Sequence, residues 1–184
     1  MISRWALLAL AIFGVINYPT SADDRHDAAL QVFKSINERL SWMDDVALYK
    51  LRNTVAVEDL EREAVVVQKA LEGAEAAGLD PISVEAFFRS QIAAAKAIQY
   101  RCLAQWQFAG PDGDASADLD GTIRPALIRI GGDFLEFLGE YLEKFGPLDE
   151  SQWPLFLANV DVGRLTVLEK RQLFLDLTGI SLLR

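Results

Sequence analysis

Two cationic residues lie on what should be the buried face of a long helix. Arg39 and Lys50 are eleven residues apart, and eleven steps of about 100° return a helix to within about 20° of its starting direction. Val32, Ile36 and Met43 recur on the same stripe at helical spacing, so this face should pack inward. Because a buried cation is costly without an anionic partner, the pattern predicts a site for a small anionic ligand.

A second group of charged residues opens the next predicted helix. Asp59, Arg62 and Glu63 are spaced at i, i+3 and i+4, so all three side chains project from one face of its first turns. Taken alone, this spacing favours an exposed ladder of salt bridges, which contributes little to stability. Because the chain also carries the Arg39 and Lys50 stripe, we favour the other interpretation, in which Asp59, Arg62 and Glu63 help to line the same anion site.

A neutral amide stands on the apolar stripe of the third predicted helix. Gln99 shares this stripe with Phe88, Ala95 and Trp106. An amide can donate and accept hydrogen bonds, and a buried glutamine needs partners. Gln99 is therefore either a contact to the ligand or a core residue satisfied by a neighbouring side chain or a helix carbonyl. Gln91, on a neighbouring face, is predicted to form a structural hydrogen bond.

The elements that must position these residues are helices. Apolar residues recur with a period of 3.6 almost throughout, and no window shows sustained β alternation, which predicts an all-α, single-domain bundle of about six helices. Helices are expected over residues 28–53, 58–77, 81–107, 122–145 and 149–159, and after the capping box Thr166–Glu169. A Gly- and Asp-rich linker, 109–121, divides a front half, 23–108, from a back half, 122–184.

The first 22 residues have the features of a secretory signal peptide. An apolar run of about twelve residues follows Arg4, and the small residues Thr20 and Ala22 suit cleavage after Ala22. The run is shorter than the roughly twenty residues that span a bilayer. We therefore expect residues 23–184 to be periplasmic or secreted, with no membrane association after cleavage.

Composition argues against several classes of function. The chain has a formal net charge of −9, and nucleic-acid binding needs a basic surface. Cys102 is the one cysteine, so no intramolecular disulfide can form. The one histidine, His26, lies near the expected new N-terminus, where poor order is expected. Histidine metal centres, catalytic triads and histidine acid–base chemistry are not expected, and neither a metal nor a cofactor is predicted.

One interpretation of the linker is a calcium-binding loop. Four aspartates, at positions 112, 114, 118 and 120, resemble the start of a calcium loop. Ala117 stands where the loop requires glycine at its sixth position, and the glutamate of the twelfth position is also missing. The segment is therefore predicted to be a solvated acidic loop.

Four short segments together resemble a known family. INERL, VALYK, EDLERE and QIAAAKAIQY follow one another in this order and spacing behind the expected signal peptide. They are similar to the secreted gamma subclass of the AroQ-type, all-helical chorismate mutases. The resemblance covers residues 28 to 108 strongly and is weaker behind the linker, where TIRPAL resembles the point at which the family supplies a further arginine.

The resemblance implies roles for particular residues. Arg39 and Arg62 would bind the substrate carboxylates, and Arg124 would add a cationic contact from the back half. Lys50 and Gln99 would donate hydrogen bonds to the ether oxygen of chorismate. The rearrangement to prephenate is a concerted pericyclic step, so fixed donors and a held conformation are sufficient for catalysis.

The resemblance extends to three further positions in the site. Asp59 and Glu63 match acidic positions that contact the ring hydroxyl or orient the surrounding cations. Ala95 stands where related enzymes often have serine or threonine, so one side-chain contact to a carboxylate is absent. The resemblance also implies a homodimer in which each chain completes its own pocket with Arg124.

Two alternatives share this scaffold. Isochorismate pyruvate lyases resemble the same family and also use a cationic pocket, so the motifs do not by themselves exclude lyase activity. Export, the long back half and Glu63 argue against it. The other alternative is an exported helical binding protein without catalysis. Against it argues the joint presence of Arg39, Lys50, Arg62, Glu63 and Gln99.

Overall fold

The computed structural model describes residues 22–111 and 118–183. The expected signal peptide, apart from Ala22, lies outside this part, as do Asp112 and Asp114 of the linker. The helices run in the order α1 (Ala22–Ser41), α2 (Met43–Arg52), α3 (Leu60–Ala76), α4 (Pro81–Ala109), the π-helical turn η1 (Leu119–Ile123), α5 (Arg124–Phe145), the 3₁₀ turn η2 (Glu150–Gln152), α6 (Trp153–Asn159) and α7 (Val167–Thr178).

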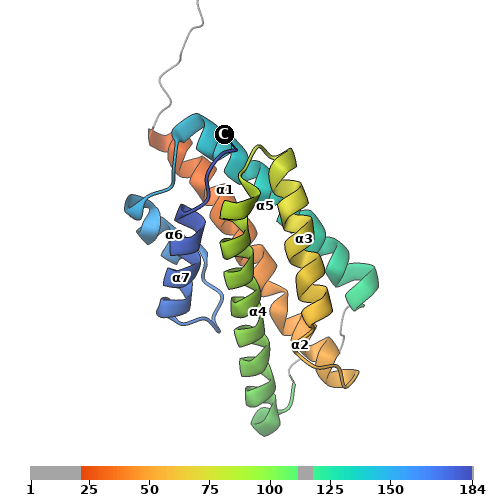
Figure 1. Cartoon of the computed structure of the whole chain (residues 1–184). Coiled ribbons are helices and arrows are strands. Elements are labelled where there is room, and N and C mark those ends of the chain that lie inside the picture. Colours follow the sequence, from red (N-terminus) through yellow and green to blue (C-terminus); the bar gives the residue numbers. More distant parts are fainter. Residues whose placement is uncertain (1–21, 112–117, 184) are drawn as a thin grey trace, which may run out of the picture.

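The all-α prediction is confirmed for the described residues, which contain no strand beyond an isolated bridge between Leu79 and Leu182. Figure 1 shows α4 running lengthwise through the molecule, with α3 and α5 on one side and α6 and α7 on the other. Contacts join α1 to α5, α3 to α4, α2 to α4 and α4 to α7. The back half therefore packs against the front half around one core.

Side-chain caps fix where several helices begin. Asp59 accepts a hydrogen bond from the Arg62 amide at 3.0 Å and caps α3. Asp80 accepts one from the Ile82 amide at 3.1 Å and caps α4, whose first residue is Pro81. These caps satisfy amides that have no partner inside a helix. The predicted starts of α3, α4 and α7, which begins after the Thr166 capping box, are confirmed.

The first expected helix, 28–53, is wrong at its start and in its middle. α1 already begins at Ala22, so His26, which was expected to lie in a poorly ordered terminus, is an exposed helical residue. Trp42 interrupts the helix with φ −69° and ψ −8°. This ψ tightens the turn relative to an ideal helix, and α2 then starts a new series of hydrogen bonds. If α1 and α2 are counted as one, the described α-helices number six, as expected.

The linker is shorter than the expected 109–121. Ala109 is the last residue of α4, which ends at Gly110 with φ +73°, a conformation that favours glycine. Leu119–Ile123 already forms the π-helical turn that leads into α5. Pro125, which lacks an amide hydrogen, lies in the first turn of α5, where that donor is not needed.

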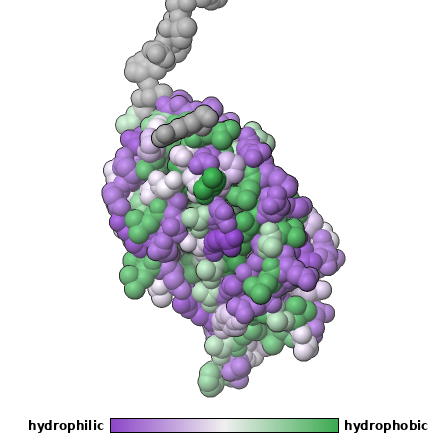
Figure 2. Space-filling model, viewed as in Figure 1, coloured by the Kyte–Doolittle hydropathy of each residue, from purple (hydrophilic) through white to green (hydrophobic). Residues whose placement is uncertain are grey.

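Figure 2 shows hydrophilic and hydrophobic side chains mixed over the visible face. No helix in the described ranges is long and apolar enough to cross a membrane. Cys102 is fully buried beside Asp44, and these surroundings raise the pKa of its thiol to about 12, chiefly through the loss of water. A thiol that stays protonated is a poor nucleophile, so Cys102 is a core residue.

Two glycines inside α5 provide a matched stability test. A Cβ at Gly139 would lie 2.5 Å from the carbonyl oxygen of Ala77, whereas one at Gly132 would have no atom within 4 Å. We expect Gly139→Ala to destabilise the protein by about 1 to 3 kcal/mol through backbone displacement. Gly132→Ala should stabilise it by about 0.5 to 1 kcal/mol, because alanine favours a helix interior. Urea unfolding of both variants measures this, and equal effects would contradict the close approach of α3 and α5.

Candidate active site

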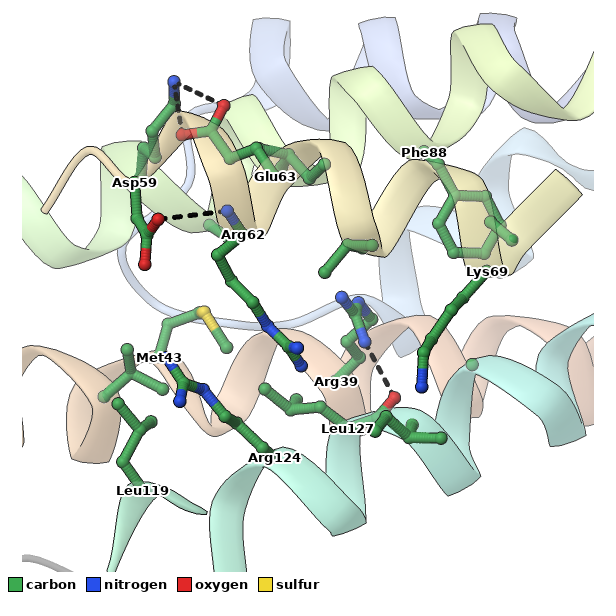
Figure 3. Close-up of a pocket in the computed structure, with 18 of the residues that line it drawn as sticks. Arg39, Met43, Asp59, Arg62, Glu63, Lys69, Phe88, Leu119, Arg124 and Leu127 are labelled. Atoms are coloured by element: carbon green, nitrogen blue, oxygen red, sulfur yellow. Dashed lines mark hydrogen bonds and ion pairs between the residues drawn. The ribbon is translucent and has the colours of Figure 1, made fainter.

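A cavity of about 550 Å³ opens between α1, α2, α3, α4 and α5. It is the place where the predicted site residues meet. Each of the eight lines its wall, although they come from five helices and a loop: Arg39, Lys50, Asp59, Arg62, Glu63, Ala95, Gln99 and Arg124. Figure 3 shows the arginines converging on the cavity from opposite walls. Arg39 and Lys50 therefore face the same cavity, as their eleven-residue spacing predicted, although Trp42 interrupts the helix between them.

Arg39 carries a partly buried charge, and no acidic side chain in the described part of the chain pairs with it. Its Nη1 donates to the backbone carbonyl of Leu127 at 2.8 Å. Burial, together with the positive charge of Arg62, lowers the pKa of Arg39 to about 10. The guanidinium therefore stays charged at neutral pH. Because a desolvated charge is stabilised by an opposite one, the electrostatics favour an anion at this position.

Arg62 adds a second cation that is not neutralised. Its backbone amide is used in capping α3, but within the described chain its guanidinium forms no hydrogen bond or ion pair with another side chain. The predicted alternative, an exposed ladder joining Asp59, Arg62 and Glu63, is therefore not formed. Figure 3 shows the Arg62 side chain pointing into the cavity toward Arg39. Two adjacent guanidinium groups can bind one or two carboxylates.

Lys50 and Gln99 are both buried at the cavity wall, with 9% and 5% exposure. The ammonium of Lys50 donates to the carbonyl of Val57 at 2.6 Å, and burial lowers its pKa, an effect that the carboxylate of Asp59 opposes. Gln99 Nε2 donates to the carbonyl of Ala95 at 3.2 Å. It also approaches the sulfur of Met43 at 3.6 Å. Sulfur is a weak acceptor, so this hydrogen can turn to a better one.

The two glutamines differ in location. Gln99 Oε1 is buried at the cavity without a hydrogen-bond partner in the described structure. The amide nitrogen of Gln99 donates to a helix carbonyl, as expected if Gln99 were a core residue. Gln91 is also buried, but it does not line the cavity. Its Oε1 has no hydrogen-bond partner in the described structure, so the structural hydrogen bond predicted for Gln91 is not formed through this oxygen.

Glu63 is held by a residue that sequence reasoning missed. The Lys96 ammonium lies 3.1 Å and 3.2 Å from the two carboxylate oxygens of Glu63 and 3.6 Å from Glu58. These carboxylates raise the pKa of Lys96 against the opposing effect of its partial burial. Lys96 is three residues before Gln99 on α4, so i, i+3 spacing could have placed it at the site.

Arg124 reaches the cavity from the start of α5 and forms an ion pair with Asp120 of the π-helical turn. Figure 3 shows its guanidinium near Met43, on the side of the cavity away from Lys69. Lys69 is the other cation that sequence reasoning missed, although it follows Arg62 by seven residues and so shares its helix face.

The balance of charge in the cavity is opposite to that of the chain. Six cationic and three acidic side chains line it, a local net charge of +3 in a chain of net charge −9. Phe88, Ile92 and Val66 supply apolar walls between them. In a cleft the local potential governs binding. The site can therefore hold a small dianion that also carries an apolar ring or chain.

Comparisons with known proteins identify the family of this chain. Residues 24–100 match the family model described as chorismate mutase type II. The chain is 33% identical over 147 residues to the secreted chorismate mutase of Yersinia pestis, covering 80% of this chain and 78% of the relative. It is 33% identical over 148 residues to the monofunctional chorismate mutase of Enterobacter agglomerans, covering 80% of each.

A solved structure shares the fold as well as the sequence. The crystal structure of the Yersinia pestis secreted chorismate mutase superposes with a TM-score of 0.77 and 33% identity, covering 83% of this chain and 98% of that one. The likeness thus spans both the front helices and much of the back half. This chain belongs to the type II chorismate mutase family.

Proposed function

We propose that this protein is an exported chorismate mutase, which rearranges chorismate to prephenate. The observation that carries the proposal is the pair of uncompensated cations, Arg39 and Arg62, in a cavity that also holds Lys50 and Gln99. Chorismate is a dianion with a ring, which suits the charge and the apolar walls of the cavity. The secreted relative of Yersinia pestis supports export.

The proposed mechanism is electrostatic. Arg39, Arg62 and Arg124 would grip the two carboxylates and hold the compact conformation in which the reacting carbons approach each other. As the C–O bond breaks, negative charge grows on the ether oxygen, and the buried donors Lys50 and Gln99 would stabilise it there. Because these donors are fixed before the reaction, little reorganisation is needed in the transition state.

The acidic residues would act on the other side of the substrate. Glu63, which Lys96 holds in place through both oxygens, would accept a hydrogen bond from the ring hydroxyl. Asp59, whose carboxylate already caps α3, would orient the cations around it. Ala95 would offer only its methyl group to the ligand.

The domain assignment is part of this proposal. Residues 1–22 would be a signal peptide removed on export, and residues 23–184 one periplasmic or secreted domain. The back half would complete the site of its own chain, because Arg124 lies on α5 and lines the same cavity as the front-half residues. The protein would act as a homodimer without metal or cofactor.

Loss of chorismate absorbance tests the proposal directly. Protein purified from cells that express the full chain should convert chorismate to prephenate, and Lys50→Ala should lower kcat about a hundredfold because it removes a donor to the developing charge. A folded protein that leaves chorismate unchanged would refute the mutase. Consumption of isochorismate with release of pyruvate would instead identify the lyase.

A further inference from the structure

The cavity continues past the eight predicted residues. Beyond Arg39 it is lined by Lys69 and Gly73 of α3 and by Gly131 and Gly132 of α5. Figure 3 shows the side chain of Lys69 pointing across the cavity toward the α5 wall that carries Leu127. Lys69 thus stands at the Arg39 end of the site, opposite the end at which Arg124 lies.

Lys69 has an exposed side chain that no acid neutralises. Within the described chain no hydrogen bond or ion pair holds its ammonium, whereas Lys96 is paired with Glu63 and Glu58. Glu72, which follows Lys69 by three residues on the same helix, accepts a hydrogen bond from Gln68 at 3.1 Å. In a chain with 27 acidic residues, an unpaired lysine at a cavity mouth is available to an incoming anion.

At the Arg39 end of the site the donors are the guanidinium group of Arg39 and that of Arg62, which points toward it (Figure 3). On α4 the wall at this end consists of the apolar residues Phe88, Ile92 and Ala95. Arg39 already uses Nη1 to donate a hydrogen bond to the carbonyl of Leu127. A carboxylate offers about four acceptor positions. A carboxylate held by these two guanidinium groups can therefore still accept a hydrogen bond from a further donor.

The glycines of α5 keep this end open. A Cβ at Gly131 would lie 4.0 Å from Arg39 Nη1, and one at Gly132 would meet no atom within 4 Å. Glycine inside a helix lowers the stability of the helix, so two consecutive glycines on the cavity wall destabilise α5 locally. Their effect is to leave space between Arg39 and Lys69 for a ligand group.

We infer that Lys69 binds the same substrate carboxylate as Arg39 and closes the cavity over it. The inference rests on the proposed function. Lys69 holds the ground state and the transition state alike, because this carboxylate keeps its charge throughout the rearrangement. It therefore contributes uniform binding, which lowers KM without changing kcat.

The test compares Lys69→Met with Lys34→Met, in which an exposed lysine of α1 outside the cavity is changed in the same way. Lys69→Met should raise KM for chorismate about tenfold with kcat unchanged, and weaken calorimetric binding of prephenate to the same degree. Lys69→Arg should keep a KM near that of the wild type. Lys34→Met should leave both constants unchanged.

Salt dependence gives a second measure. Added sodium chloride should raise KM less steeply for Lys69→Met than for the wild type, because one screened attraction has been removed. If Lys69→Met and Lys34→Met share the wild-type KM and salt dependence, the role of Lys69 is refuted while the mutase stands. A fall in kcat alone would also refute it. Wild-type protein without turnover would overturn the mutase and this inference together.

Discussion

Arg39→Met should lower kcat/KM for chorismate by at least about a thousandfold and at the same time raise the stability of the protein. The loss of activity follows from the proposed role of Arg39, because the substitution removes a charged hydrogen-bonding group that would bind a substrate carboxylate. The gain in stability follows from the state of Arg39 without ligand, where its charge is desolvated and repelled by Arg62.

The size of the stability gain follows from the pKa. At pH 7 Arg39 is protonated in both the folded and the unfolded chain, so the lowering of its pKa to about 10 is a cost of folding over the whole neutral range. This cost is about 3 kcal/mol by linkage. It disappears only as the pH rises above 10. Loss of the bond to Leu127 reduces the net gain to about 1 to 3 kcal/mol.

Urea unfolding at pH 7 and steady-state kinetics measure the two effects. Arg89→Met is the matched control, since Arg89 is an exposed residue of α4 that pairs with Glu85 one turn away. It should change both quantities little. A clear loss of stability in Arg39→Met would mean that Arg39 is already compensated in the unliganded protein, and the anion site would lose its main support.

The fold was largely predictable because its signals are local. Asp59, Asp80 and Thr166 are each followed by apolar residues at helical spacing, and each caps a helix in the structure. The turn at Trp42 was not predictable, because nothing in its type breaks a helix and apolar periodicity continues on both sides. In the structure, α1 before this turn packs against α5 and α2 after it packs against α4.

The site was predictable as a set of residues but not as a set of contacts. Spacing placed Arg39, Lys50 and Gln99 on inward faces, and all three line the cavity. The pairing of Glu63 with Lys96 joins residues 33 positions apart on different helices. No periodicity within either helix reports such a contact. The position of α5 at the same cavity likewise depends on long-range packing, which the sequence indicated only through the family resemblance at Arg124.

Gln99→Glu should make the enzymatic activity strongly dependent on pH, whereas the wild-type activity should be nearly independent of it. In the proposed mechanism the wild-type amide donates to the ether oxygen at any pH, so activity should be nearly constant from about pH 5 to 8. In the variant a carboxyl group replaces a side chain that is 5% exposed, and burial favours its neutral form. It can donate while protonated, but once ionised it repels the charge that develops on the oxygen.

We therefore expect Gln99→Glu to retain most activity at pH 5 and to lose about a thousandfold in kcat by pH 8. Gln99→Met, which removes the donor without adding a charge, is the control: its kcat should be low at every pH and show no such slope. The difference between the two variants at pH 8 measures the repulsion alone. A wild-type profile that falls steeply above pH 6 would contradict the role of Gln99.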